Sequence, residues 1–199
     1  MIAGFQHLPA WIRPDAQRAL MDEVLALARA APFYRPVTPA GKPMSVAMTN
    51  FGPLGWVTDS SGYRYQARHP ETDAPWPAIP KLLVHLWAEL CDAAVPPDCC
   101  LVNRYDAGAR MGQHRDADEA DFRFPVLSVS LGDTGLFRLG GLKRADPSQQ
   151  IPLASGDVVL LAGKARRAYH GVDRVLAGSS TLVPGGGRIN LTLRRASPA

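Results

Sequence analysis

The sequence predicts a mainly β fold, a jelly roll or small barrel with two flanking helices, on three observations. From residue 100 onward the chain is typical of short strands separated by turns. Its 199 residues include 18 glycines and 18 prolines, whereas average proteins contain about 12% of the two together, so many turns are expected. Only two stretches have the spacing of an amphipathic helix.

The first predicted helix spans residues 14–31, because Pro14 suits the first helical position and Pro32 ends it. The second spans residues 80–94, with leucines on one side and Pro96-Pro97 as the stop. Residues 33–79 between them are rich in proline, glycine, threonine and aromatic residues. This composition predicts short strands and loops that cover another part of the molecule.

Six strands are predicted in the second half of the chain, each bounded by a turn signal. They are residues 100–105, 126–131, 136–139, 157–162, 170–172 and 188–195. We expect one unit in two parts: helices and covering segment in residues 1–95, and a β core in residues 96–199.

Composition excludes several classes of protein. No apolar run approaches the roughly 18 residues that a membrane span needs, and residues 1–10 do not resemble a signal peptide. The three cysteines, Cys91, Cys99 and Cys100, are odd in number and lack a CxxC spacing. A disulfide framework or a cysteine zinc site is therefore not expected, and a reduced cytoplasmic setting fits.

Charge is unevenly distributed along the chain. The net charge of +4 is compatible with binding nucleic acid without establishing it. Residues 160–199 hold seven Lys or Arg and one Asp, whereas residues 114–121 hold four acids and one Arg. An acidic spot in a basic protein therefore requires an explanation.

Strict alternation in residues 188–194 places Arg188, Asn190, Thr192 and Arg194 on one face of a strand. Asn103 and Tyr105 share a face of the strand 100–105 in the same way. One interpretation is an antiparallel sheet whose polar face meets water. The other is a polar cavity inside a jelly roll, where Arg side chains would bind a carboxylate ligand.

His114 and Asp116 form an HxD motif, whose side chains point the same way on an extended chain. His170 is a candidate third ligand, and two His with one carboxylate form the facial triad of non-haem Fe(II) oxygenases. HxD alone is weak evidence, and a lone His is more often structural. Arg188 and Arg194 follow His170 at spacings that suit a 2-oxoglutarate site. His7, His69 and His85 lack such company and are expected to be structural or surface residues.

With these residues in place, the sequence resembles the AlkB family of Fe(II)/2-oxoglutarate dioxygenases, in particular bacterial AlkB-type DNA-repair demethylases. The resemblance covers most of the chain, from about residue 33 to residue 194. The motifs that carry it are residues 37–39 with 44–50, 54–56, 75–77, 101–105, 114–119, 128–132, 140–144, 169–171 and 188–194.

The resemblance implies a double-stranded β-helix core with an N-terminal nucleotide-recognition lid. It implies Fe(II), 2-oxoglutarate and O₂ as cofactors. By this likeness, the Fe(II) ligands are His114, Asp116 and His170. The 2-oxoglutarate site comprises Asn103, Tyr105, Arg188, Asn190 and Arg194. In this interpretation Arg194 pairs with the distal carboxylate of 2-oxoglutarate, and Arg188 and Asn190 lie near its metal-chelating end.

The resemblance also implies substrate contacts. Trp56 and the ring of His114 would sandwich a flipped base, and Asp118 would contact the base edge. The remaining implied contacts are Thr38, Tyr63 and Arg110 on the phosphate backbone, Met48 in the lid and Arg144 beside the pocket. Glu119 and Asp121 are expected on a solvated loop. Methylation at N1 of adenine or N3 of cytosine makes the base cationic, so an acid such as Asp118 would favour the lesion and explain the acidic spot.

The implied reaction is oxidative demethylation of 1-methyladenine and 3-methylcytosine in DNA, preferably single-stranded, with release of formaldehyde, succinate and CO₂. Double-stranded DNA and RNA stay open as substrates, no membrane partner is expected, and the likeness implies a monomer. One alternative is a dioxygenase of the same fold acting on methylated RNA, a protein or a small molecule. Another is a binding module without iron. The sequence departs from the family pattern at Leu161, Leu139, Arg115 and Ala117, of which the first two are expected to alter the cavity near 2-oxoglutarate.

Overall fold

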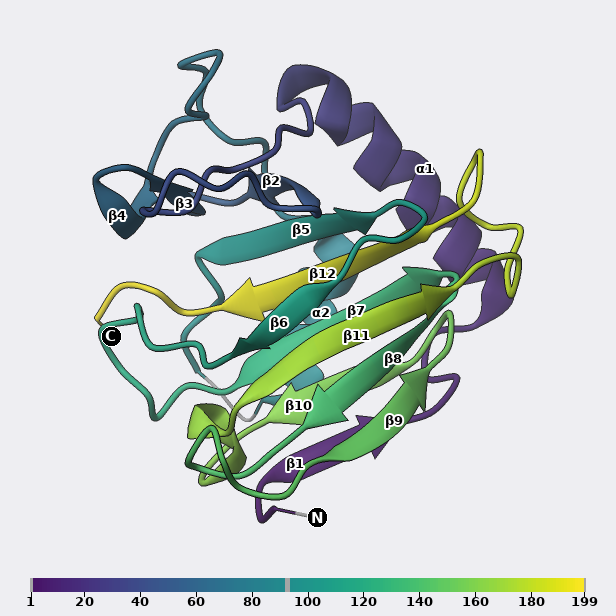
Figure 1. The fold of residues 1–199 in the computed structure, drawn as a ribbon. Helices are drawn as coiled ribbons and strands as arrows, with labels where there is room; N and C mark the ends of the chain where they lie inside the picture. Colours follow the sequence, from purple (N-terminus) through teal and green to yellow (C-terminus); the bar gives the residue numbers. More distant parts are fainter. Residues whose placement is uncertain (1, 92–93, 199) are drawn as a thin grey trace.

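Two antiparallel sheets lie face to face in the computed structural model, which describes residues 2–91 and 94–198 (Figure 1). The larger sheet has the strand order β1-β10-β7-β12-β5-β2. Its strands are β1 (Phe5–Leu8), β2 (Ala47–Phe51), β5 (Cys99–Tyr105), β7 (Val126–Gly132), β10 (Val158–Leu161) and β12 (Arg188–Arg194). The smaller sheet has the order β6-β11-β8-β9. Its strands are β6 (Met111–His114), β8 (Thr134–Leu139), β9 (Gln149–Leu153) and β11 (His170–Leu176). The predicted jelly-roll architecture is confirmed.

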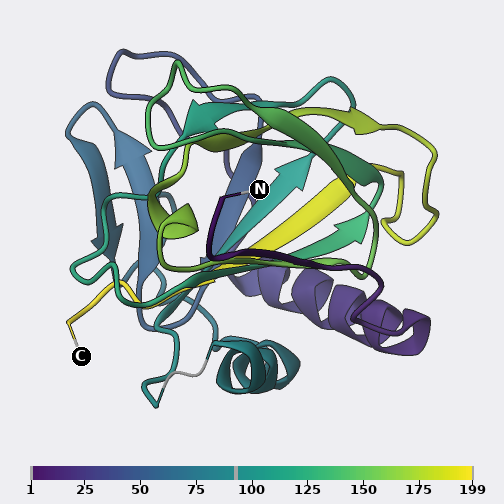
Figure 2. The same ribbon diagram turned by 90° about the horizontal axis from the view of Figure 1, so that it is seen from below.

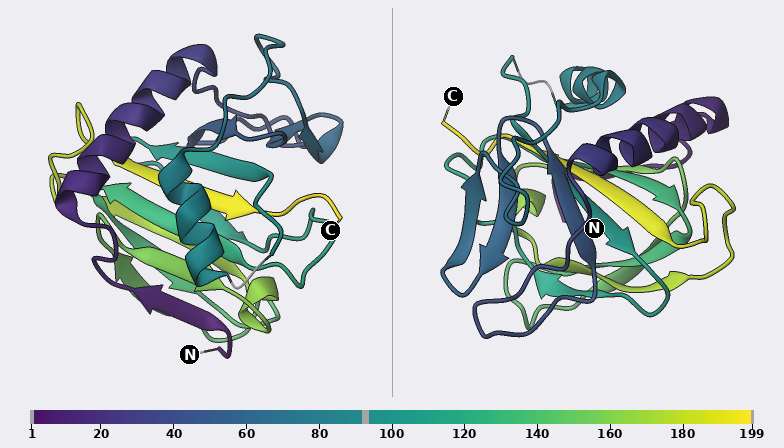
Figure 3. Two further views of the ribbon diagram at one scale, coloured as in Figure 1. Left: turned by 180° about the vertical axis from the view of Figure 1, so that it is seen from behind. Right: turned by 90° about the horizontal axis from the view of Figure 1, so that it is seen from above.

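Two helices cover the outer face of the larger sheet, α1 (Pro14–Ala30) and α2 (Lys81–Leu90) (Figure 3). Leu20 and Val24 of α1 and Trp87 of α2 are buried in one cluster with apolar side chains of β5, β7, β10 and β12. Burying such side chains stabilises the fold by about 1.5–3 kcal/mol each relative to exposure. The helices therefore seal this face of the sheet from water.

Strand β12 has one face toward the helices and the other toward the smaller sheet. Ile189, Leu191 and Leu193 are fully buried and belong to the cluster beneath the helices. The alternate side chains, from Arg188 to Arg194, therefore point between the two sheets. The interpretation of a polar sheet face in water is wrong for this strand, because the second sheet covers that face.

A separate hairpin, β3 (Gly55–Asp59) and β4 (Gly62–Gln66), forms its own two-stranded sheet. Figure 2 shows it beside the sandwich, next to one edge of the core. Trp76 packs against Gly55, where an added Cβ would lie 2.4 Å from the indole, so only glycine fits. The prediction of short strands and loops between the two helices is confirmed.

Helix boundaries and most core strands follow the sequence prediction closely. Helix α2 ends at Leu90, and the predicted extension to residue 94 passes through residues 92–93, which lie outside the described residues. Strands β1, β6 and β9 were not predicted. Among the described residues, no helix is long and apolar enough to cross a membrane. The division after residue 95 stays a prediction; β1 and β2 pair with the core strands β10 and β5.

Candidate metal centre and substrate pocket

His114, Asp116 and His170 meet at one end of the space between the sheets. His114 ends β6 and His170 begins β11, and these residues are paired across the two strands. One ligand atom from each of the three residues lies within 4.8 Å of the others. The predicted HxD motif and the distant histidine are therefore brought together, in a donor set that suits Fe(II).

Backbone carbonyls fix both imidazole rings. Nδ1 of His114 lies 2.9 Å from the carbonyl of Gly112, and Nδ1 of His170 lies 3.0 Å from the carbonyl of Ala168. A carbonyl oxygen only accepts, so each Nδ1 carries the proton and each Nε2 keeps a lone pair for a metal. Burial, together with nearby His114, lowers the pKa of His170 to about 4, so this ring is neutral near pH 7.

Arg194 forms an ion pair with the carboxylate of Asp116. Nη2 of Arg194 lies 2.9 Å from Oδ1 of Asp116, and Nε lies 3.2 Å from Oδ2. Burial by itself would raise the pKa of the Asp116 carboxyl, but Arg194 and the two histidines outweigh it and hold this pKa well below its ordinary value. Asp116 is therefore an oriented, ionised carboxylate.

Arg188 lies at the other end of β12, away from this cluster. It is 1% exposed, and its guanidinium donates to the carbonyl of Leu153 at 3.0 Å and to Oγ of Ser130 at 2.7 Å. Among the described residues it forms no ion pair, and its buried Nε has no hydrogen-bond partner. Burial lowers the pKa of Arg188 to about 10, so it remains charged near neutral pH.

These positions bear on the expected order of the two arginines. Arg194 is already paired with Asp116, one of the predicted metal ligands, whereas Arg188 is a buried cation with no carboxylate partner in residues 2–91 and 94–198. The pairing of Arg194 with the distal carboxylate, with Arg188 near the metal, stays a prediction, and these positions favour the opposite assignment. Alternation places both side chains on one face of β12 but does not indicate at which end the metal ligands lie.

Polar side chains line the space between these two ends. Asn190 donates to Oγ of Ser128 at 2.7 Å and accepts from the hydroxyl of Thr192 at 2.9 Å. The side-chain oxygen of Asn103 is buried without a partner. Burial raises the pKa of Tyr105 to about 12, so its hydroxyl keeps its proton. The cavity of about 610 Å³ lined by these residues has room and unpaired polar atoms for a small dicarboxylate.

Trp56 reaches this cavity from the hairpin. Its indole Nε1 donates to Oδ2 of Asp118 at 2.8 Å, and its ring stacks on Tyr63 with 5.6 Å between centroids. Trp56, Asp118 and His114 all line the cavity. The structure therefore brings together the three groups predicted to hold a base, and Tyr63, which also lines the cavity, stacks on the indole.

Three of the remaining predicted contacts line the cavity, and Arg110 does not. Thr38, Met48 and Arg144 line the cavity, with Met48 fully buried and Arg144 exposed. Arg144 donates to the carbonyl of Gln113 at 2.7 Å. Arg110 is exposed and does not line the cavity. Leu161 lines the cavity, whereas Leu139 is buried outside its lining.

Glu119 was expected in solvent and is instead buried. It pairs with Arg166 at 2.9 Å and with Arg194 at 3.3 Å, and it accepts the hydroxyl proton of Tyr65 at 2.7 Å. Arg166 also donates to the backbone carbonyl of Asp116 at 2.9 Å. Sequence reasoning missed Arg166 and Tyr65, because neither has a spacing that distinguishes it from exposed neighbours. Ser128 shares a face of its strand with other polar residues, a signal that could have revealed it.

Comparisons with known proteins agree with this geometry. The model of a family described as the 2OG-Fe(II) oxygenase superfamily matches residues 4–194. An alpha-ketoglutarate-dependent dioxygenase AlkB homolog of Caulobacter vibrioides is 61% identical over 199 residues, covering 100% of this chain and 90% of the relative. Alpha-ketoglutarate-dependent dioxygenase AlkB of Escherichia coli strain K12 is 44% identical over 186 residues, covering 92% of this chain and 86% of the relative.

The solved structure of OsALKBH1 superposes with a TM-score of 0.82 at 29% identity, covering 98% of this chain and 99% of that one. Its likeness extends over the sandwich and the hairpin together. The His-Asp-His cluster, in which Asp116 and His170 are buried and His114 is partly exposed, supplies the donor set that an iron-dependent oxygenase requires. The chain therefore belongs to the AlkB family of Fe(II)/2-oxoglutarate-dependent dioxygenases, enzymes that use Fe(II), 2-oxoglutarate and O₂.

Proposed function

We propose that this enzyme demethylates 1-methyladenine and 3-methylcytosine in DNA, preferably single-stranded, releasing formaldehyde, succinate and CO₂. One observation carries the proposal. A single cavity contains the three-ligand cluster, an aromatic platform on Trp56 and the carboxylate of Asp118. We expect the enzyme to act as a monomer in solution.

The pocket chemistry suits a cationic base. Methylation at N1 of adenine or N3 of cytosine places positive charge on the ring near neutral pH, which a π-face and a carboxylate attract. Trp56 and His114 supply aromatic faces, and Asp118 supplies the negative charge. Methylation also blocks base pairing, so a flipped lesion costs less to extrude than a normal base.

The hairpin acts as the lid in this proposal. The Tyr63 ring orients the indole of Trp56, and Asp118 fixes its Nε1. Thr38, Tyr63 and Arg110 contact the phosphates of the strand that carries the lesion, and Met48 limits the depth of the pocket. Arg144 lies beside the base entrance. Exclusion of water by the closed lid restricts the oxidation to the bound methyl group.

The opposite end of the cavity holds the cosubstrate. Arg188 and the protonated hydroxyl of Tyr105 bind the distal carboxylate of 2-oxoglutarate, because a buried cation without an anion stabilises an incoming carboxylate strongly. Asn103 and Asn190 orient the molecule along the cavity, and Arg194 keeps Asp116 in place. His114, Asp116 and His170 hold the iron. When bound, iron, 2-oxoglutarate and O₂ supply the oxidant that hydroxylates the N-methyl carbon, after which formaldehyde leaves.

Formaldehyde release from an oligonucleotide carrying 1-methyladenine or 3-methylcytosine tests the proposal. We expect release that requires Fe(II) and 2-oxoglutarate together and disappears in His170→Ala. Asp118→Asn is a matched variant that keeps the shape of the side chain and should weaken the lesion substrate more than the uncoupled turnover of 2-oxoglutarate. A ribose oligonucleotide of the same sequence, tested in parallel, measures the preference for DNA.

Two results would contradict the proposal in different ways. Succinate formation without formaldehyde from any methylated nucleic acid would assign the enzyme a protein or small-molecule substrate. Equal Fe(II) binding by the wild type and by a His114→Ala, Asp116→Ala variant would show that the iron site is elsewhere.

A further inference from the structure

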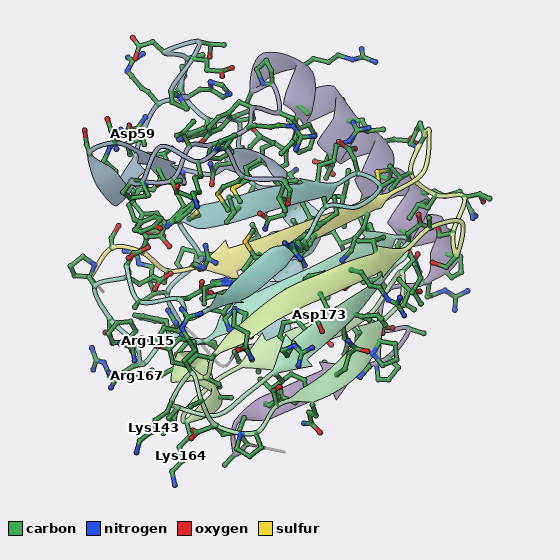
Figure 4. All side chains as sticks on the ribbon, viewed as in Figure 1. Asp59, Arg115, Lys143, Lys164, Arg167 and Asp173 are labelled. Atoms are coloured by element: carbon green, nitrogen blue, oxygen red, sulfur yellow. The ribbon has the colours of Figure 1, made fainter. Side chains whose placement is uncertain are left out.

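Five exposed cations, together called the basic rim, include two that line the cavity, Arg115 and Arg144, and three close to them in the sequence or on the same flank (Figure 4), Lys143, Lys164 and Arg167. They come from three segments, the end of β6, the loop between β8 and β9, and the short 3-10 helix η1 (Ala165–Arg167) with the residue before it. Figure 4 shows Arg115, Lys143, Lys164 and Arg167 at the lower left, below the hairpin that carries Asp59. Among the described residues, none of the five forms an ion pair with a carboxylate.

Aromatic rings, in place of carboxylates, position the arginines of the rim. The guanidinium carbons of Arg115 and Arg144 lie 5.7 and 4.9 Å from the centre of the Tyr169 ring. That of Arg167 lies 5.6 Å from the centre of the Phe122 ring, which buried Arg166 also contacts. A guanidinium held by a π-face keeps its N–H donors available, and their planar geometry matches the oxygens of a phosphate.

Backbone hydrogen bonds fix the segments of the rim relative to one another. Gly140 donates to the carbonyl of Tyr169 at 2.8 Å, and Tyr169 donates to the carbonyl of Gly141 at 2.9 Å. The neighbouring carboxylate of Asp146 accepts the backbone N–H of Lys143 at 2.9 Å, so it stabilises the loop and leaves the lysine ammonium unpaired. The rim is therefore a preorganised positive surface, built into the turns that also shape the cavity mouth.

We propose that the basic rim binds the phosphates of the second strand of duplex DNA. This inference rests on the proposed function, in which Thr38, Tyr63 and Arg110 contact the strand that carries the lesion. A base flipped from a duplex leaves its former partner strand on the opposite side of the opening. Arg115 and Arg144 of the rim line the cavity, and Lys143, Lys164 and Arg167 lie on the same flank as Arg115 (Figure 4). The positive charge of this flank suits a backbone that carries one negative charge per phosphate.

The test compares two triple variants on two substrates that carry the same lesion, one single-stranded and one duplex. Lys143→Gln, Lys164→Gln, Arg167→Gln removes three rim charges and leaves Arg115 and Arg144 at the cavity intact. Arg18→Gln, Arg29→Gln, Lys81→Gln removes the same charge from exposed positions on the helices behind the larger sheet. Formaldehyde release is measured over a series of salt concentrations.

We expect the rim variant to lose about tenfold or more in kcat/KM on the duplex, with a salt dependence weaker by about 2.7 in slope, since each lost phosphate contact removes about 0.9. Its activity on the single strand should remain within about twofold of the wild type, as should both activities of the helix variant. An equal loss on the two substrates would place the lesion strand on the rim and overturn the inference. Unchanged duplex activity, or an equal loss in the helix variant, would overturn it as well.

Failure of the proposed function gives a different pattern. If the wild type released no formaldehyde from either substrate, demethylation of these lesions would be wrong. The inference about the rim would then be judged by fluorescence anisotropy with an unmodified duplex. The rim variant must bind this duplex more weakly than the helix variant does, and equal affinities would refute the inference.

Discussion

Arg194 and Asp116 form a two-point ion pair inside the sandwich, with distances of 2.9 and 3.2 Å between their nitrogen and oxygen atoms. Both side chains are less than a tenth exposed. An arginine six residues away on the same strand face, Arg188, forms no ion pair among the described residues. Arg194 therefore holds the Asp116 carboxylate in place, whereas the charge of Arg188 is balanced by no carboxylate among the described residues.

Arg194→Gln should destabilise the protein before any metal is added. The change leaves the buried Asp116 carboxylate without its cation, which costs about 3–5 kcal/mol. Urea unfolding of the metal-free protein measures the loss. Arg123→Gln breaks an exposed pair with Asp121 and should cost about 1 kcal/mol or less. Equal stabilities of the two variants would contradict the role of Arg194.

Arg188→Met should impair binding of 2-oxoglutarate. Removing one partner of a buried, charge-assisted contact costs about 2 kcal/mol or more, which corresponds to a rise of roughly 30-fold or more in the KM for 2-oxoglutarate. Succinate formation without nucleic acid gives this KM, and the increase in Tm on adding 2-oxoglutarate should disappear. Arg138→Met removes a half-exposed arginine paired with Asp173 and should leave the KM unchanged. An unchanged KM in Arg188→Met would show that another residue binds the distal carboxylate of 2-oxoglutarate.

Gly135→Ala should impair binding of 2-oxoglutarate through a steric clash with Arg188. The added Cβ would lie 2.8 Å from Nε and 3.0 Å from Cζ of Arg188, so the guanidinium must move. Overpacking of this kind costs about 1–3 kcal/mol, and we expect the KM for 2-oxoglutarate to rise about tenfold. Fe(II) titration of the same variant is the internal control, because the metal ligands lie at the other end of the cavity. A KM equal to that of the wild type would show that Arg188 is free to shift without loss.

Tyr65→Phe should weaken the attachment of the hairpin to the metal-ligand loop. The Tyr65 hydroxyl donates to Glu119 at 2.7 Å, and a hydrogen bond to a charged group contributes about 1.5–3 kcal/mol. Thermal unfolding measures the effect. Tyr63→Phe is a matched control, since Tyr63 is 53% exposed and, among the described residues, its hydroxyl has no hydrogen bond. Similar Tm values for both variants would mean that this contact does not stabilise the fold.

The sequence predicted those parts of the fold and site in which residues follow a regular spacing. The alternation in residues 188–194 indicated both faces of β12, and the HxD spacing indicated two of the three clustered ligands. The same alternation could not distinguish Arg188 from Arg194, because residues six apart on a strand share a face. That distinction depends on where β6 and β11 meet β12 across the sandwich, which only the folded chain determines.

Other features left no local signal. Glu119 forms an ion pair with Arg166, which lies 47 residues further along the chain. The sequence near Glu119 therefore does not indicate that this residue is buried. Strand β1 has four residues and gains its stability from pairing with β10. Strand β9 contains Pro152 and lies at the edge of its sheet, where proline is tolerated. Partners distant in sequence therefore decide these cases.

With 2-oxoglutarate bound beside Arg188 as proposed, the cosubstrate should also stabilise the folded enzyme. A ligand that binds only the folded chain stabilises it by RT ln(1 + [L]/Kd), about 2.7 kcal/mol when the ligand is present at about 100 times its Kd. We therefore expect fewer unfolded, protease-sensitive molecules in a cell rich in 2-oxoglutarate than in a starved cell. On this expectation, the concentration of 2-oxoglutarate would affect the abundance of the enzyme as well as its rate.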